Sequence, residues 1–285
     1  MSASAAPALS TLLLIGCGKM GGALLGGWLE RGIAQRYLVV EPGPGAEPFR
    51  MRRGVDVVRS AADLDLGLKP DTLDLSLKPD AIVFAIKPQV MPAAVGDYRR
   101  FATEGTLYLS IAAGKTLAFF ARALGQEAAL VRAMPNTPAA IGRGISVACA
   151  GPCVTSAQRG IAERLLAAVG EVAWVEDEAL IDAVTAVSGS GPAYVFLLIE
   201  CLAKAGVAAG LPADLAERLA RATVTGSGEL ARLSPETAAQ LRENVTSPGG
   251  TTRAALDVLM AKDGLEPLLT RAVLAAAKRS RELAD

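Results

Sequence analysis

A glycine pattern near the N-terminus, Gly16-Cys-Gly18-Lys-Met-Gly21, constrains the fold more than any other feature of this chain. The apolar run Thr11–Ile15 comes directly before it, and a helical pattern that reaches about Arg31 follows it. Between a strand and a helix, the first glycine makes the turn, the second admits a pyrophosphate, and the third lets the helix pack on the strand. The pattern therefore predicts a dinucleotide-binding unit. A purely structural glycine turn is the alternative.

Glu41 ends a second predicted strand, Tyr37–Val40, at about the ~20-residue offset expected for an acid that binds a ribose. A carboxylate accepts hydrogen bonds from a 2′-hydroxyl and repels a 2′-phosphate, so Glu41 favours NADH. Neither Arg nor Ser follows at once, although Arg50, Arg52 and Arg53 lie downstream, and NADPH stays open. In the alternative interpretation, Glu41 points into solvent at the end of the strand.

Strand and helix patterns alternate over the first part of the chain. Further strands are predicted at Val55–Val58, Ala81–Ile86, Thr106–Ser110 and Ala129–Arg132, with helices near Met91–Phe101 and Thr116–Leu124. This alternation predicts an α/β fold with a Rossmann-like, doubly wound parallel sheet. Additional edge strands are predicted at Ile145–Ala150 and Glu171–Val175, around a helix over Ser156–Val169, and every segment from Asp177 onward is predicted to be helical.

These patterns divide the chain into three parts. We expect a disordered tail over residues 1–10, a dinucleotide-binding domain over residues 11–175, and an all-helical dimerisation and substrate domain over residues 176–285. The length of 285 residues agrees with about two domains of the usual ~100–200 residues. A near-repeat with a nine-residue period, Leu64–Asp71 and Leu73–Asp80, is interpreted as a surface duplication, because two copies are too few for a solenoid.

Composition excludes several classes of function. The formal net charge is 0, so nothing indicates nucleic-acid binding, and no apolar run approaches the ~18 residues of a membrane span. The start of the chain lacks the features of a signal peptide, so we expect a cytoplasmic protein with reduced cysteines. The chain has no histidine, which excludes Ser-His-Asp and Cys-His catalysis. Cys149 and Cys153 lack further metal ligands, and no metal site is expected.

Candidate ligand-binding residues follow the predicted strands, at the edge where open α/β sheets bind their ligands. Ala85, Lys87 and Pro88 follow or end the fourth strand, Ala113 and Gly114 follow the fifth, and Asn136 follows the sixth. Lys87 and Asn136 are the side chains expected at a nicotinamide ribose or carboxamide. As alternatives, Lys87 is a solvated loop lysine, Asn136 is a turn residue, and the small residues form an ordinary loop.

The nine residues Asn244–Thr252 interrupt the helical half of the chain. Ser247-Pro-Gly-Gly250 cannot continue a helix, and Thr251 and Thr252 lead into apolar residues with helical spacing. The free N–H groups at such a helix start suit a small carboxylate or phosphate, and two hydroxyls add possible hydrogen bonds. The alternative is a capped interhelical turn. Ser188–Tyr194 is a second glycine-rich helix start, which by itself indicates only a helix cap.

Together these segments resemble pyrroline-5-carboxylate reductase. The resemblance runs from about Thr11 to Glu282 and is carried by the glycine pattern, Ala85–Pro88, Ala112–Gly114, Met134–Pro138, Asp182–Tyr194 and Asn244–Thr252. It implies the last step of proline biosynthesis, the NAD(P)H-dependent reduction of 1-pyrroline-5-carboxylate to L-proline. It also implies a helical domain that interleaves with a partner subunit, in a homodimer that assembles to a decamer. The duplication and the Glu41-Pro42 strand end depart from the pattern, since many relatives carry Arg or Ser there and prefer NADPH.

The resemblance assigns roles to residues of this chain. Substrate binding falls to Ser247, Gly249, Gly250, Thr251 and Thr252, with Thr252 as the catalytic candidate that hydrogen bonds the ring nitrogen. The candidate cofactor-binding residues are Gly16, Gly18, Lys19, Met20, Gly21, Glu41, Ala85, Lys87, Pro88, Ala113, Gly114 and Asn136. A protonated cyclic imine accepts a hydride readily, so a strong enzyme acid is unnecessary and orientation is the main contribution of the protein.

Two other functions are consistent with parts of the sequence. A β-hydroxyacid dehydrogenase shares the two-domain architecture and uses a helical lysine as acid and base, for which Lys204 in the predicted helix Val195–Ala209 is the candidate. Reduction of a keto acid, abolished by Lys204→Ala, would favour that reading. A non-enzymatic NAD(P) sensor would bind the cofactor without turning over an imine.

Overall fold

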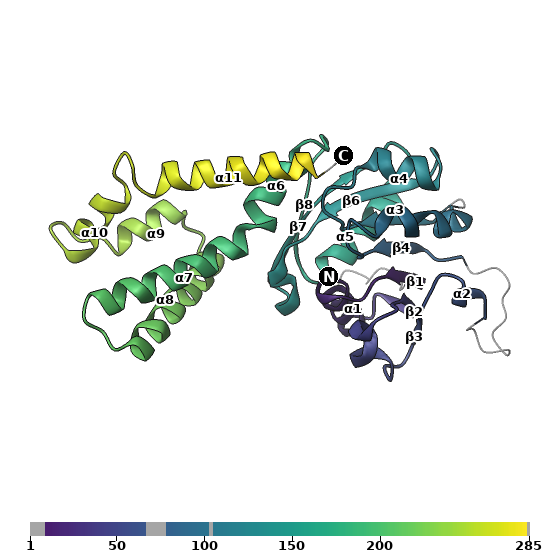
Figure 1. The fold of residues 1–285 in the computed structure, drawn as a ribbon, viewed down its shortest axis with the longest axis horizontal. Coiled ribbons are helices and arrows are strands. Elements are labelled where there is room, and N and C mark those ends of the chain that lie inside the picture. Colours follow the sequence, from purple (N-terminus) through teal and green to yellow (C-terminus); the bar gives the residue numbers. More distant parts are fainter. Residues whose placement is uncertain (1–8, 67–77, 103–104, 284–285) are drawn as a thin grey trace, which may run out of the picture. The chain divides into compact units, whose positions relative to one another are not determined.

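The computed structural model describes residues 9–66, 78–102 and 105–283 (Figure 1). Contacts divide the chain into two compact units, Met1–Gly189 with Ala277–Asp285, and Ser190–Ala276. The expected tail over residues 1–8, and residues 67–77 of the expected duplication, lie outside the described residues. The expected boundary at residues 175 and 176, which separates strands from helices, stays a prediction.

The first unit contains one sheet of eight strands (Figure 1). They are β1 (Leu9–Ile15), β2 (Ala34–Val40), β3 (Val55–Val58), β4 (Ala81–Phe84), β5 (Leu107–Ser110), β6 (Ala129–Met134), β7 (Gly144–Ala150) and β8 (Gly170–Trp174). The order is β3-β2-β1-β4-β5-β6-β7-β8, and β6–β7 is the antiparallel pair among otherwise parallel neighbours. The strand order reverses between β1 and β4, where a doubly wound sheet binds its ligand. The expected Rossmann-like fold is confirmed.

Helices cover both faces of this sheet, so its central strands are apolar on both sides. They are α1 (Lys19–Arg31), α2 (Asp63–Leu66), α3 (Met91–Ala94), α4 (Leu117–Leu124), α5 (Ser156–Ala167) and α6 (Leu180–Val184), with 3-10 segments Pro44–Phe49, Val95–Phe101 and Thr137–Ile141. Trp28 of α1 and Leu165 of α5 are buried against one face, and Phe120 of α4 is buried against the other. Trp28 also donates a hydrogen bond to the Leu165 carbonyl, at 2.8 Å.

Several expected elements have other bounds or another character in the structure, and four of these differences bear on the fold. Strand β1 starts at Leu9, whose N–H donates to the Ile33 carbonyl, so residues 9 and 10 belong to the sheet and not to a tail. Strand β4 ends at Phe84, two residues early. The segment Met91–Phe101 is a short α-helix followed by a 3-10 helix. Strand β7 pairs on both sides, so β8 alone of the two expected edge strands lies at the edge.

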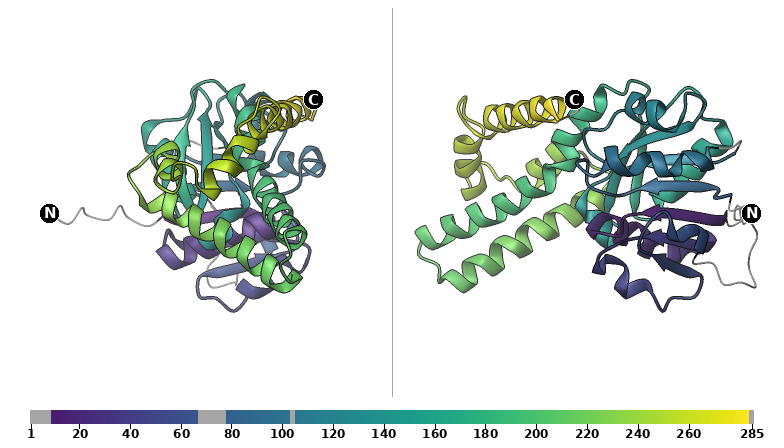
Figure 2. Two further views of the ribbon diagram at one scale, coloured as in Figure 1. Left: turned by 90° about the vertical axis from the view of Figure 1, so that its left-hand side faces the viewer. Right: turned by 45° about the vertical axis from the view of Figure 1, so that its right-hand side comes forward.

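Every element after Asp177 is helical, as expected. A π-helical turn, Thr185–Gly189, connects α6 to α7 (Gly191–Ala208), and α8 (Ala213–Leu233), α9 (Ala238–Asn244), α10 (Thr251–Leu259) and α11 (Leu265–Glu282) follow. Helices α7 and α8 lie side by side (Figure 2). They approach closely at Gly206, where an added Cβ would lie 3.2 Å from the Ala216 Cβ.

The continuous helix Leu180–Ala208 bears on the expectation that no apolar run approaches the length of a membrane span, which stays a prediction. It is 29 residues long and has a stretch of mean hydropathy 1.5, which is long and apolar enough to cross a membrane by length and composition. Only 6% of this stretch is buried within the chain.

Candidate functional site

The predicted glycine pattern forms a tight turn between β1 and α1. Gly16 has a φ of +89°, and a Cβ there would lie 2.9 Å from the Ala85 carbonyl oxygen. A Cβ on Gly21 would lie only 2.3 Å from the Gly16 carbonyl oxygen, so both positions require glycine. In contrast, nothing lies within 4 Å of an added Cβ at Gly18, the N-cap of α1, which has no side-chain cap. Open backbone before a 13-residue helix is a cradle that a pyrophosphate fits.

Glu41 is held against this turn and is half-buried. One carboxylate oxygen, Oε2, accepts a hydrogen bond from the Cys17 N–H at 2.7 Å, and Oε1 accepts one from the Gly43 N–H at 2.8 Å. Glu41 therefore ties the end of β2 to the glycine turn and does not simply point into solvent. Its predicted contact with a ribose stays a prediction.

Cys17 lies inside the glycine turn and is almost fully buried. Burial, with a smaller contribution from the Glu41 carboxylate, raises the pKa of the Cys17 thiol to about 11. Because the thiolate is the reactive form, this thiol stays protonated and inert at neutral pH. The glycine turn therefore offers backbone donors to a ligand and carries no nucleophile.

A hollow of about 290 Å³ lies where β4, β5 and β6 end. It gathers six of the predicted cofactor-binding residues from four separate segments, namely Met20, Ala85, Lys87, Pro88, Ala113 and Asn136. Its other lining residues are mainly apolar or small, including Ile86, Ile111, Met134 and Gly189. An apolar hollow with a few polar groups at this edge of a doubly wound sheet suits a planar ring such as nicotinamide.

The polar residues at this hollow differ in how firmly they are held. The Asn136 side-chain oxygen accepts a hydrogen bond from the Ile145 N–H at 2.9 Å, so it positions the start of β7. Lys87 is exposed and makes no ion pair among the described residues. Gly114 does not line the hollow. It has a φ of +69°, and an added Cβ would lie 2.7 Å from the Leu283 carbonyl oxygen.

The second candidate site is the turn before α10. Gly249 has a φ of +68°, the Gly250 N–H donates to the Ser247 carbonyl at 3.1 Å, and an added Cβ on Gly250 would lie 2.4 Å from Ser247 Oγ. Helix α10 has no side-chain N-cap, and the N–H groups of residues 251–253 have no acceptor within the described parts of the chain. Thr252 is half-buried, whereas Thr251 is exposed. Three free donors at a helix start suit a carboxylate.

Lys204, the candidate acid and base of the alternative function, is exposed on α7. It lines a hollow of about 530 Å³ together with Phe196, Glu200, Glu217 and Arg221. Within the described residues Lys204 makes no ion pair or side-chain hydrogen bond that would orient its amine. The arrangement does not resemble a positioned acid and base.

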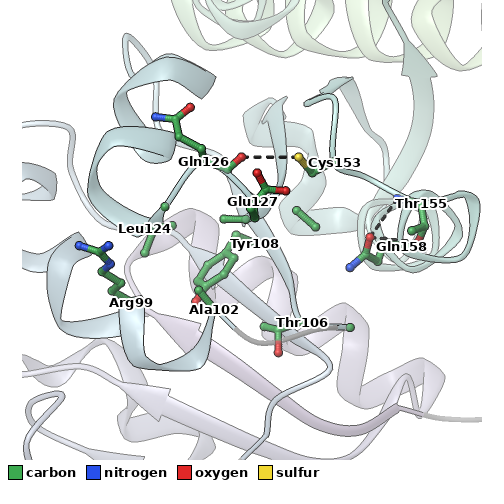
Figure 3. A pocket seen from close by; sticks show the side chains of 14 residues that line it. Arg99, Ala102, Thr106, Tyr108, Leu124, Gln126, Glu127, Cys153, Thr155 and Gln158 are labelled. Carbon is green, nitrogen blue, oxygen red and sulfur yellow. Dashed lines mark hydrogen bonds between the residues drawn. The ribbon is translucent and has the colours of Figure 1, made fainter.

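Another hollow of about 530 Å³ lies at the start of β5 and β6, the edge opposite to the predicted sites (Figure 3). Its polar groups largely bond to one another. Cys153 Sγ donates to the Gln126 carbonyl at 3.5 Å, and Thr155 and Gln158 form a capping box. The Tyr108 hydroxyl donates to the Tyr98 carbonyl, at 2.8 Å. These satisfied groups indicate a packing crevice.

Two arginines escaped the sequence analysis. Arg132 is only 3% exposed within β6 and pairs with Glu178 Oε1 at 2.8 Å, while the same oxygen accepts from the Leu117 N–H at 2.9 Å. Its Nη2 atom is buried without a partner among the described residues. The signal in the sequence that could have revealed Arg132 is a charged residue inside an otherwise apolar strand. Arg59 follows β3 and donates to the Pro42 carbonyl at 3.4 Å, a proximity that only strand pairing creates.

Two family models match the chain. The model described as "Pyrroline-5-carboxylate reductase dimerisation" matches residues 178–283. The model described as "NADP oxidoreductase coenzyme F420-dependent" matches residues 11–114. The first therefore covers the helices from α6 onward, and the second covers the glycine turn and the first five strands.

Curated relatives and solved structures match over nearly the whole chain. Pyrroline-5-carboxylate reductase from Pseudomonas aeruginosa is 40% identical, covering 96% of this chain and 97% of its own, and the Pisum sativum enzyme is 38% identical with 96% of each covered. The Coxiella burnetii pyrroline-5-carboxylate reductase structure has a TM-score of 0.87 at 33% identity, over 97% and 99%. The Plasmodium falciparum pyrroline carboxylate reductase, solved with NADP bound, has a TM-score of 0.78 at 28% identity, over 97% and 98%.

Proposed function

The chain belongs to the pyrroline-5-carboxylate reductase family, and from this premise we propose that it reduces 1-pyrroline-5-carboxylate to L-proline with NAD(P)H, the last step of proline biosynthesis. The single observation that carries the proposal is the 40% identity to a curated reductase over 96% of this chain. A match of that length includes most of both compact units, and so it covers more than a shared nucleotide fold.

The first unit binds the cofactor, which supplies a hydride when it is bound. Gly16 and Gly21 shape the turn that receives the pyrophosphate, Gly18 offers it open backbone, and Lys19 and Met20 lie in the first turn of α1. Ala85, Lys87, Pro88, Ala113 and Asn136 surround the nicotinamide end, and Glu41 accepts from the ribose. Gly114 sets the path of the loop after β5. Two observations support these roles: the hollow that gathers six of the predicted residues, and the open backbone at the glycine turn.

The turn before α10 binds the substrate. The free N–H groups at Thr251 and Thr252 receive the carboxylate, and Gly249 and Gly250 allow the turn to come close to it. Ser247 shapes the turn by packing against Gly250. The Thr252 hydroxyl hydrogen bonds the ring nitrogen, which is protonated before reduction, so a chain without histidine needs no strong acid of its own. Orientation of the imine carbon is then the main contribution to rate.

The helical domain, residues 176–285, joins subunits. The match of residues 178–283 to a dimerisation model supports this role. The exposed apolar side chains of α7 support this role, because a partner copy would remove them from water. The assembly is a homodimer that builds a decamer, in the cytoplasm and without membrane association.

The alternative, a β-hydroxyacid dehydrogenase that uses Lys204, is not favoured, because the curated relatives above are reductases of another substrate. The test of the proposed function is oxidation of NADH and NADPH by the purified protein with 1-pyrroline-5-carboxylate. Oxidation should require the imine and should yield proline. Absence of turnover with both cofactors under reducing conditions would contradict the proposed function. Reduction of a keto acid that Lys204→Ala abolishes would favour the alternative.

A further inference from the structure

Strand pairing places Arg59 beside the end of β2. In the parallel register Val40 lies opposite Val58, and the Glu41 N–H donates to the Val58 carbonyl at 2.9 Å. The next residue, Arg59, reaches back across the strands, and its Nη2 donates to the Pro42 carbonyl at 3.4 Å. An exposed guanidinium therefore lies at the turn that follows Glu41. This turn is where a doubly wound sheet distinguishes a ribose 2′-hydroxyl from a 2′-phosphate.

The surrounding charges leave this guanidinium available to an anion. The Glu41 carboxylate is directed at two backbone N–H groups, and no ion pair joins it to Arg59 in the described parts of the chain. Among the arginines that follow β2, Arg50 pairs with Glu47 at 2.7 Å. Arg59 makes one long hydrogen bond to a neutral carbonyl and has up to five N–H donors.

We propose that Arg59 binds the 2′-phosphate of NADPH and thereby allows a chain with Glu41 at the ribose to use both cofactors. This inference rests on the proposed use of NAD(P)H. With NADH, the Glu41 carboxylate accepts from the 2′-hydroxyl and Arg59 stays in solvent. With NADPH, the planar guanidinium binds the phosphate oxygens and offsets the repulsion from Glu41. Arg59 thus supplies a cation beside the end of β2, where neither Arg nor Ser follows Glu41 at once.

The test uses nucleotides that require no turnover. Calorimetry measures the binding of 2′,5′-ADP and of 5′-AMP, which differ only in the 2′-phosphate, to the wild-type protein and to Arg59→Ala. A charge-assisted hydrogen bond is lost only for the 2′-phosphate, so Arg59→Ala should weaken 2′,5′-ADP binding about ten- to hundred-fold and leave 5′-AMP binding within about two-fold. Arg59→Lys keeps the charge without the fork and should fall between the two.

Arg36→Ala is the matched control, because it removes the same charge from the opposite end of β2. Five residues of strand separate Arg36 from Glu41, roughly 16 Å and beyond the Debye length. Arg36→Ala should leave the binding affinity for both nucleotides unchanged. Equal losses of 5′-AMP and 2′,5′-ADP binding in Arg59→Ala would show that Arg59 supports the fold, and no loss would show that it only contacts solvent. Either result overturns the proposal, and both are independent of whether the protein reduces an imine.

Discussion

Thr252 occupies the second position of α10, where a half-buried hydroxyl lies beside backbone donors that are free within the described residues. Replacing it with alanine removes the hydroxyl and keeps those donors, so only the proposed contact to the substrate nitrogen is lost. A hydrogen bond to a charged group is worth roughly 1.5–3 kcal/mol, and kcat/KM for the imine should fall about ten- to hundred-fold. Steady-state kinetics with saturating cofactor measure this fall.

Conservative and distant substitutions separate this role from a helix cap. Thr252→Ser restores the hydroxyl and should recover much of the activity, and NADH binding should be unchanged in both variants. Thr270→Ala removes an exposed hydroxyl that bonds the Glu266 carbonyl within α11, and it should leave kcat/KM unchanged. Wild-type kinetics in Thr252→Ala, or a loss of cofactor binding instead, would show that Thr252 is structural.

Glu41 is expected to set the balance between the two cofactors. Glu41→Ser removes a carboxylate that would repel a 2′-phosphate and accept from a 2′-hydroxyl. Loss of one such repulsion near the surface is worth roughly 1–2 kcal/mol, so the kcat/KM ratio should shift about ten-fold towards NADPH. Glu47→Ser removes an exposed carboxylate of the next turn and serves as the control. An unchanged ratio in Glu41→Ser would mean that the carboxylate serves only the glycine turn.

Cys17 should make stability depend on alkaline pH. Its folded-state pKa is raised from 9.0 to about 11, so between these values the folded chain holds a proton that the unfolded chain loses. The unfolded state then binds fewer protons, and the free energy of unfolding falls as pH rises, by up to about 1.4 kcal/mol per pH unit. Urea unfolding at pH 8.5 and 10.5 should show a smaller decline for Cys17→Ala than for wild type. Equal falls in the free energy of unfolding for the two proteins would contradict a role of the Cys17 thiol. Cys201→Ala, which alters an exposed thiol, is the control.

At the scale of elements, one ion pair connects β6, the start of α4 and the segment before α6. Glu178 precedes α6, accepts from the first N–H of α4, and pairs with Arg132 of β6. Glu178→Ala leaves Arg132 buried without its counter-charge, and breaking a buried pair costs about 3–5 kcal/mol, reduced here to about 2–3 because Glu178 is partly exposed. Urea unfolding at fixed protein concentration measures this loss in the free energy of unfolding.

A surface pair on the same segment provides the comparison. Glu176 is exposed and lies 3.5 Å from Arg159, so Glu176→Ala should change stability by less than about 0.5 kcal/mol. The double variant Arg132→Met with Glu178→Leu removes both charges and should regain part of the loss. If Glu178→Ala were as mild as Glu176→Ala, the buried pair would not anchor α6.

The elements that sequence predicted well are those whose signals are local. The strand at Val55–Val58, the glycine turn after β1 and the helix near Thr116–Leu124 depend on a few neighbouring residues, and the structure confirms each. The same holds for the helix that begins after Gly250, because proline and glycine end one helix and free N–H groups start another.

The elements that sequence missed depend on pairing between distant segments. Nothing near β7 in the sequence says that it runs antiparallel to β6, and Leu9 joins the sheet through a bond to Ile33. For the candidate site, the hollow at the ends of β4 to β6 was expected, since carboxyl ends of parallel strands meet. Arg59 was missed because only the β2–β3 register brings it to Pro42.

At the scale of the whole molecule, the helices after Gly189 expose apolar side chains that are unfavourable in water for a single chain. Helix α7 buries none of its residues, and Phe196, Leu197 and Leu198 are 59%, 56% and 50% exposed. Single chains rarely expose contiguous apolar surface of this kind unless a partner or a membrane covers it. The match of this segment to a dimerisation model indicates a second copy.

The protein should therefore be an obligate dimer or larger. Sedimentation at micromolar protein should show no species of 29.3 kDa, the mass of one chain. Aromatic residues dominate interface energetics, so Phe196→Asp should weaken association by at least about 2 kcal/mol, or roughly thirty-fold in dissociation constant. Met51→Asp places the same charge on a side chain that is 96% exposed in the other unit and should leave the mass unchanged. A monodisperse wild-type monomer would contradict the dimer, and flotation of that monomer with lipid vesicles would assign Leu180–Ala208 to a membrane instead.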